Sequence, residues 1–183
     1  MPASALFASV FATVVAASPP ASPAPAAAPT ATTVATTSFA PVDDKTWNAT
    51  VQAHHGKVLL VSFWASYCQP CLEEMPDLLA LAQKNAATLD VVFVNTDDPA
   101  STAHVQAILR RRKIVLPSSS SLAVVAADPT PFIRAIDPNW QGEVPATVLY
   151  TVDGKRHDTL IGQHSAAELE AAIAAARAVK SGR

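Results

Sequence analysis

The chain has 183 residues and a formal net charge of −2 at pH 7. A balance this close to neutral excludes a bulk electrostatic field of the kind that attracts nucleic acid or an anionic membrane. All 13 Lys and Arg residues and all 15 Asp and Glu residues follow Val42, which leaves about 140 residues of ordinary composition, enough for one domain with a single core.

The first part of the chain divides into two segments of different composition. Residues 1–17 contain an apolar run that ends in small residues, as in a signal peptide, although no Lys or Arg precedes the run. The run is too short to span a bilayer as a helix, and a disordered Ala-rich leader is the alternative. Residues 18–41 are rich in Pro, Ala and Thr, which predicts a disordered linker before a folded domain over 42–183. We therefore expect a periplasmic or otherwise extracytoplasmic protein, exported by this leader or anchored by it.

The first half of the predicted domain alternates helices with strands. Apolar residues at helical spacing predict a helix over 43–55, and the apolar, β-branched run over 57–65 predicts a central strand. Helical periodicity over 71–86 predicts a second helix, in which Pro76 removes one backbone donor and should cause a kink. A second buried strand is predicted over 89–98.

The second half contains three more helices and a hairpin. Asp-Pro pairs that resemble helix starts open the predicted helices over 98–113 and 127–137. The Asp-Gly turn within residues 146–162 predicts a hairpin of two strands, and a capping box opens a final helix over 165–180. The resulting order, with helices between the strands and a hairpin near the end, predicts an α/β sandwich with a mixed sheet.

The two cysteines of the chain, Cys68 and Cys71, form a C-x-x-C motif between a predicted strand and a predicted helix. A disulfide between them closes so short a loop that it would stabilise the fold very little. A zinc site would need two further ligands, and the five histidines of the chain are adjacent or scattered, so we predict no metal site. An inert buried pair is the second alternative. The position at a helix N-terminus favours a redox pair instead, because the partial positive charge there stabilises a thiolate.

This placement gives the two thiols different expected roles. Cys68 should lie exposed at the helix N-terminus as the attacking nucleophile, and Cys71 should lie shielded one turn later as the resolving thiol. Pro70 supplies a fixed φ at the first helical turn without losing a needed hydrogen bond.

The segment VLLVSFWASYCQPCLEEMP resembles the active-site segment of the thioredoxin superfamily. Within that superfamily the chain is most similar, over roughly residues 42–180, to TlpA/ResA-like, redoxin-type thiol–disulfide oxidoreductases of the bacterial cell envelope. The resemblance implies a thioredoxin fold: a mixed central β-sheet flanked by helices, with an extra helical insertion between its βαβ half and its C-terminal ββα half.

Several residues match the pattern of this family. The resemblance implies that Trp64 packs beside the active site, that Tyr67 replaces a tryptophan found in many relatives, and that Glu74 is the family's acidic residue. Ser62 stands where thioredoxins place a buried Asp that moves protons, so a partly buried Glu74 with a raised pKa is the expected substitute. The alternative for Glu74 is a solvated residue of the first helical turn.

Downstream, the segment GEVPATVLYTVDGK resembles the family's cis-proline region. The resemblance implies that Pro145 is the cis-proline opposite the cysteines and that the Val144 backbone pairs with the substrate chain. It also places Gly162 beside the substrate groove, for which an ordinary turn before the last helix is the alternative.

The resemblance implies a protein disulfide reductase whose only redox group is the Cys68–Cys71 pair, with no cofactor. The uncharged Gln69 and Pro70 add no positive charge beside the Cys68 thiolate, which favours a reductant. We read the basic run at residues 110–113 as a solvated helix end rather than a nucleic-acid site.

By the resemblance, the partners are disulfide-containing proteins, such as apocytochrome c or copper-site assembly proteins, and a membrane thiol electron transducer that re-reduces the enzyme. We expect a monomer. Three alternatives stay open: a disulfide-forming oxidant, a copper chaperone without reductase activity, and a peroxidase-like redoxin, although the sequence shows no Thr or Arg arranged around Cys68 to activate a peroxide.

Overall fold

The computed structural model describes residues 36–126 and 128–179, all within the compact unit Val34–Arg183. The signal-peptide-like segment 1–17 and most of the predicted linker lie outside these residues. The elements follow in the order β1 (Ala40–Val42), α1 (Trp47–Gln52), β2 (Val58–Trp64), α2 (Gln69–Lys84), β3 (Leu89–Asn95), η1 (Pro99–Ser101), α3 (Thr102–Arg112), η2 (Ser118–Ser120), β4 (Ser121–Val124), α4 (Thr130–Ile136), β5 (Ala146–Tyr150), β6 (Arg156–Ile161) and α5 (Ala166–Ala178).

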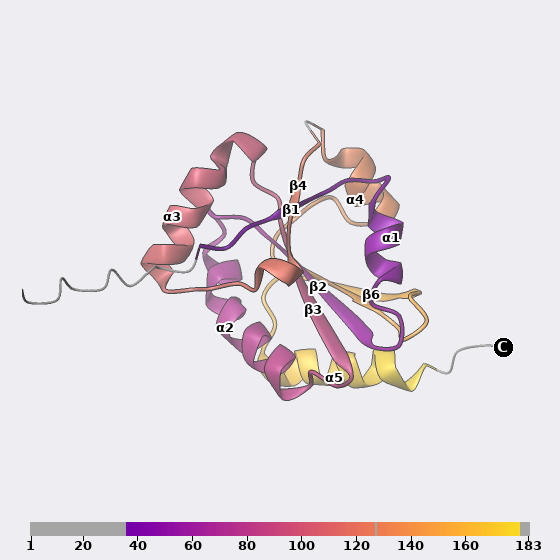
Figure 1. Ribbon diagram of the computed structural model, residues 1–183. Coiled ribbons are helices and arrows are strands. Elements are labelled where there is room, and N and C mark those ends of the chain that lie inside the picture. The colour runs from indigo at the N-terminus through magenta and orange to yellow at the C-terminus, as the bar shows by residue number, and fades with distance from the viewer. Residues whose placement is uncertain (1–35, 127, 180–183) are drawn as a thin grey trace, which may run out of the picture. The chain divides into compact units, whose positions relative to one another are not determined.

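The strands form one mixed sheet in the order β1-β4-β3-β2-β5-β6 (Figure 1). The pairs β1–β4, β4–β3 and β3–β2 are parallel, whereas β2–β5 and β5–β6 are antiparallel. Every residue of β2 is buried, as expected of a central strand with neighbours on both sides. The predicted α/β architecture with a mixed central sheet is confirmed.

Helices cover both faces of this sheet (Figure 1). One core lies between the sheet and helices α2, α3 and α5, and the other lies between the sheet and helices α1 and α4. Because side chains alternate along β2, Leu60 and Trp64 belong to the first core, whereas Leu59, Val61 and Phe63 belong to the second. Helices α3 and α4, with β4 between them, lie between β3 and β5 in the chain, where the extra helical segment was expected.

Two short strands were not predicted. β1 has three residues and β4 has four, which is too short for a periodicity signal, and they form by pairing with each other and with β3. The folded part also starts before the expected boundary at residue 42, because Thr37 is buried and bonds the backbone of Leu116.

Local signals gave the remaining elements correctly. Asp98 caps η1, which leads directly into α3. The hairpin β5–β6 turns through residues 151–155, where Gly154 has φ +74°. The capping box of Ser165 and Glu168 opens α5, and α2 continues past Pro76 to Lys84.

Candidate active site

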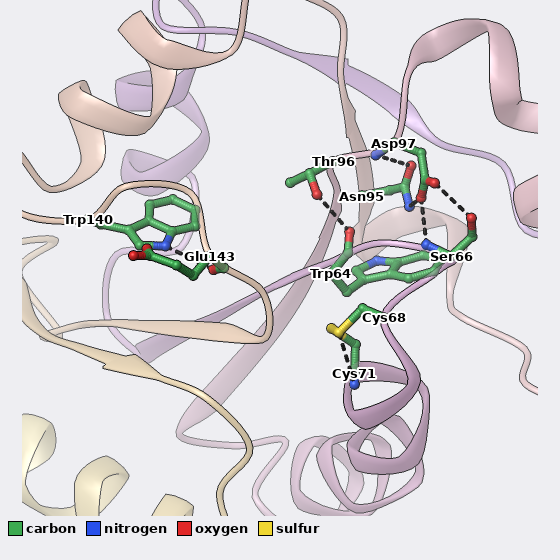
Figure 2. Close-up of a disulfide and its surroundings, with 9 residues drawn as sticks. All are labelled: Trp64, Ser66, Cys68, Cys71, Asn95, Thr96, Asp97, Trp140 and Glu143. Atoms are coloured by element: carbon green, nitrogen blue, oxygen red, sulfur yellow. Dashed lines mark hydrogen bonds between the residues drawn. A yellow bond between two sulfur atoms is a disulfide. The ribbon is translucent and has the colours of Figure 1, made fainter.

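Cys68 and Cys71 lie at the start of α2 and form a disulfide, with their Cα atoms 5.3 Å apart (Figure 2). Cys68 is the N-cap residue, and its Sγ accepts a hydrogen bond from the Cys71 amide at 3.3 Å. Pro70 occupies the first helical turn, where its missing N–H costs nothing. The helix end therefore directs a backbone donor and its partial positive charge at the Cys68 sulfur.

The prediction that Cys68 is exposed to solvent is wrong. Cys68 is only 6% exposed and Cys71 is 3% exposed, so both belong to the core on the α2 side of the sheet. The cause is that the core on the α2 side of the sheet encloses the start of α2, where the Cys68 sulfur bonds to that of Cys71 and meets the Cys71 amide. Tyr67, the preceding residue, is 77% exposed and presents an aromatic ring to solvent beside the disulfide.

A network of hydrogen bonds fastens the loop before Cys68 to the end of β3 (Figure 2). The Asp97 carboxylate accepts bonds from the Ser66 amide, the Ser66 hydroxyl and the Asn95 side chain, each at 2.7 Å. The amide and hydroxyl of Thr96 both donate to the Trp64 carbonyl. These residues were not predicted, although the sequence holds a signal for them: the carboxyl ends of adjacent parallel strands meet at one sheet edge, so polar residues after β2 and β3 should meet.

Trp64, which ends β2, is completely buried, and its ring lies 6.3 Å from that of Phe39. Its indole Nε1 is buried without a hydrogen-bond partner among the described residues. Trp140 packs on the opposite core, 4.7 Å from Phe63, and its Nε1 donates to the Glu143 carbonyl (Figure 2). Together with Tyr67, Trp140 lines a cleft of about 260 Å³ next to the cysteine loop.

The predicted cis-proline is confirmed, because the Val144–Pro145 peptide bond is cis. In the antiparallel register Phe63 lies opposite Ala146, and one further step along both strands places Pro145 beside Trp64. The Pro145 carbonyl accepts a bond from the Gly162 amide at 2.8 Å, and Gly162 has φ +93°. The structure thus brings the predicted residues Trp64, Pro145 and Gly162 to the end of the sheet where the cysteine loop begins.

Glu74 lies on α2 and is 2% exposed, so it is a buried carboxyl and not a solvated one. Burial raises its pKa above the ordinary value of 4.5, as predicted, and the backbone and charge of His164 act in the opposite direction. Glu74 Oε1 and His164 Nε2 are both buried without a hydrogen-bond partner among the described residues. Ser62, also buried, shares its face of β2 with Trp64.

A positive charge lies at Gln69, the residue after Cys68. The guanidinium of Arg112, at the end of α3, donates to the Gln69 side chain, and Gln69 in turn donates to Glu73. Gln69 and Pro70 carry no charge themselves, but the fold brings this guanidinium to Gln69 from 43 positions further along the chain.

Within residues 36–126 and 128–179, no group of three or more His, Cys, Asp or Glu side chains is arranged to hold a metal ion. The same part of the chain has no helix with the length and apolar character needed to cross a membrane.

Comparisons with known proteins agree with this geometry. The Redoxin family model matches residues 21–155. Segments of the chain are similar to the thiol:disulfide interchange protein HelX of Rhodobacter capsulatus, at 44% identity over 45 residues, and to the thioredoxin-like protein YneN of Bacillus subtilis, at 43% over 47 residues. These segments cover 25% and 26% of this chain, and they cover 26% and 28% of the two relatives, so each match spans about a quarter of both proteins.

Among solved structures, a thiol:disulfide interchange protein of the thioredoxin family from Chlorobium tepidum superposes with a TM-score of 0.52 at 22% identity. The superposition covers 70% of this chain and 83% of that one, which shows that the fold is a thioredoxin fold.

Proposed function

The chain belongs to the redoxin family of the thioredoxin superfamily, and from this premise we propose that it is an extracytoplasmic thiol–disulfide oxidoreductase that reduces protein disulfides. The observation that carries the proposal is the Cys68–Cys71 disulfide at the N-terminus of α2, where the Cys71 amide donates to the Cys68 sulfur. This donor and the helix dipole stabilise a Cys68 thiolate, which is the reactive form in disulfide exchange.

The proposed reaction has two exchange steps. The Cys68 thiolate attacks one sulfur of a substrate disulfide, which forms a mixed disulfide and releases the other substrate sulfur as a thiolate. Cys71 then loses its proton and attacks the Cys68 sulfur. The substrate leaves with both of its sulfurs reduced, and the enzyme keeps the Cys68–Cys71 disulfide, so two electrons pass to the substrate.

Glu74 is the proposed acid–base group for the second step. It lies three residues after Cys71 on the same helix and is therefore on the same face. Its burial and raised pKa suit a group that takes a proton from a thiol and later returns it. Ser62, which stands where thioredoxins place a buried Asp, cannot perform this step.

The substrate chain is proposed to lie against the end of β5. The Val144 backbone would pair with the substrate, with Pro145 and Gly162 flanking the groove, and the hydrogen bond between these two supports a fixed wall at this point. Tyr67 and Gln69 border the cysteines on their exposed side, and Trp64 supports the loop from within.

The location and partners rest on the resemblance and on the composition of the leader. We propose that disulfide-containing proteins, such as apocytochrome c or copper-site assembly proteins, are the substrates and that a membrane thiol transducer supplies electrons. HelX, one of the relatives, is a thiol:disulfide interchange protein, which supports this class of partner.

The reduction potential of the Cys68–Cys71 pair tests the proposal. The protein is equilibrated in thiol buffers, and its thiols are trapped and counted. A value at or below that of thioredoxin, about −270 mV, supports a reductant. A value near about −120 mV would make the protein an oxidant instead, and a pair that forms no disulfide would overturn the redox function altogether.

A further inference from the structure

The last turn of α3 presents two arginines to the exposed side of the cysteine loop. Arg111 and Arg112 line a cleft of about 290 Å³ together with Ser66, Gln69, Leu72 and Ile108. Ser66 and Gln69 lie on either side of Cys68 in the chain, so the cleft is lined by the segment that carries the attacking cysteine. Leu72 and Ile108 give the cleft apolar surface, and both pack against the core on the α2 side of the sheet.

The positive charge of this cleft is not neutralised by the protein itself. Among the described residues, neither Arg111 nor Arg112 forms a salt bridge, whereas Lys57, Lys84 and Arg156 each pair with a carboxylate. No acidic residue lines the cleft.

Two carboxylates bond to lining residues, but neither bonds to an arginine. Glu73 accepts from Gln69, and Asp97 accepts from Ser66 and Asn95. Among the described residues, the one hydrogen bond from these arginines is that of Arg112 to Gln69, so both guanidinium groups keep donors for a ligand.

Complementing the helix dipole does not explain this arrangement. Arg110 lies in the same last turn and would serve the dipole equally well, yet it lines a different hollow with Thr36, Gln106 and Ile114. Arg112 instead reaches across to Gln69, which fixes its guanidinium at the rim of the cleft.

We propose that this cleft binds an acidic side chain of the substrate protein, close in sequence to the cysteine that Cys68 attacks. The inference rests on the proposed function and names a specificity within it. An Asp or Glu side chain suits the site because a guanidinium fork binds a carboxylate through paired hydrogen bonds, while Leu72 and Ile108 can contact the methylene stem.

The test compares reduction rates for two peptides. Both carry the same disulfide and differ only in two flanking residues, which are Glu in one and Gln in the other. The fully reduced wild-type chain should reduce the Glu peptide about fivefold faster at low salt, and the preference should shrink as salt is added, as expected for exposed ion pairs. Arg111→Ala/Arg112→Ala should abolish the preference.

Two further variants sharpen the test. Arg110→Ala removes a charge from the same helical turn but not from the cleft, so it should keep the preference. Arg111→Glu/Arg112→Glu should favour a Lys-flanked peptide over the Glu peptide, a gain that a misfolded protein could not show. The reduction potential of each variant is measured alongside, so that a change in driving force is separated from recognition.

The outcomes separate this inference from the function on which it rests. Equal rates for the Glu and Gln peptides, or an equal loss of preference in Arg110→Ala, would overturn the acidic-substrate inference alone. Failure of the reduced wild-type chain to reduce either peptide would overturn the proposed function and the inference with it.

Discussion

Replacement of Asp97 by alanine should destabilise the oxidised protein by about 2–4 kcal/mol. The carboxylate accepts three hydrogen bonds of 2.7 Å that hold the cysteine loop against the end of β3. A hydrogen bond to a charged group contributes about 1.5–3 kcal/mol, but the three bonds share one carboxylate and are not additive. The carboxylate is also partly exposed, so water replaces some of the lost interaction.

The assay is urea denaturation of the oxidised protein, followed by tryptophan fluorescence, because Trp64 ends β2 directly before the loop that Asp97 holds. Asp98→Ala is the matched control. Asp98 is exposed and accepts one bond, from the Ala100 amide, so its loss should cost at most about 1 kcal/mol. If Asp97→Ala were no more destabilising than Asp98→Ala, the network would not be what fastens the loop.

Two further predictions concern a buried charge and a strained turn. Burial raises the pKa of Glu74, so its ionisation destabilises the fold, and the free energy of unfolding should fall as pH rises from the ordinary carboxyl value through the raised one. Glu74→Gln should remove this fall. Urea titrations at a series of pH values measure it, and a variant whose free energy of unfolding depends on pH as in the wild type would contradict the prediction. Gly154→Ala should cost about 1–2 kcal/mol from φ +74°, and little more, because the exposed His55 ring, whose Nε2 would lie 2.3 Å from the new Cβ, can move aside. Thermal unfolding should show a similar loss for Gly56→Ala, where φ is also positive and nothing lies within 4 Å; a clearly larger loss for Gly154→Ala would contradict the free movement of His55.

The features that could be predicted from the sequence are those that a short stretch of chain determines by itself. The position of Cys68 and Cys71 at a helix start follows from a strand-like run, a turn and helical periodicity within some thirty residues. The capping box and the hairpin turn are equally local. The cis-proline needed the family resemblance, because nothing in the residues around Pro145 distinguishes it from an ordinary proline.

The features that were missed depend on residues that are distant in sequence. Strands β1 and β4 are too short to give a periodic pattern in the sequence, and they form only through their pairing in the sheet. The burial of Cys68 is also a tertiary property, because the core on the α2 side of the sheet encloses the helix start. The motif therefore predicted which side chains form the disulfide, but not how the surrounding fold buries them.

Arg112 shows why this distinction matters for the chemistry. Gln69 and Pro70 are uncharged, so their sequence alone indicated a weakly stabilised thiolate, but the fold places a guanidinium on Gln69. A Cys68 thiolate that approaches a disulfide flanked by carboxylates would meet repulsion between like charges. In the proposed complex, the positive charge of Arg111 and Arg112 would offset that repulsion. The same two side chains would then both select an acidic substrate and ease the approach of the thiolate to it, which links the choice of partner to the exchange reaction.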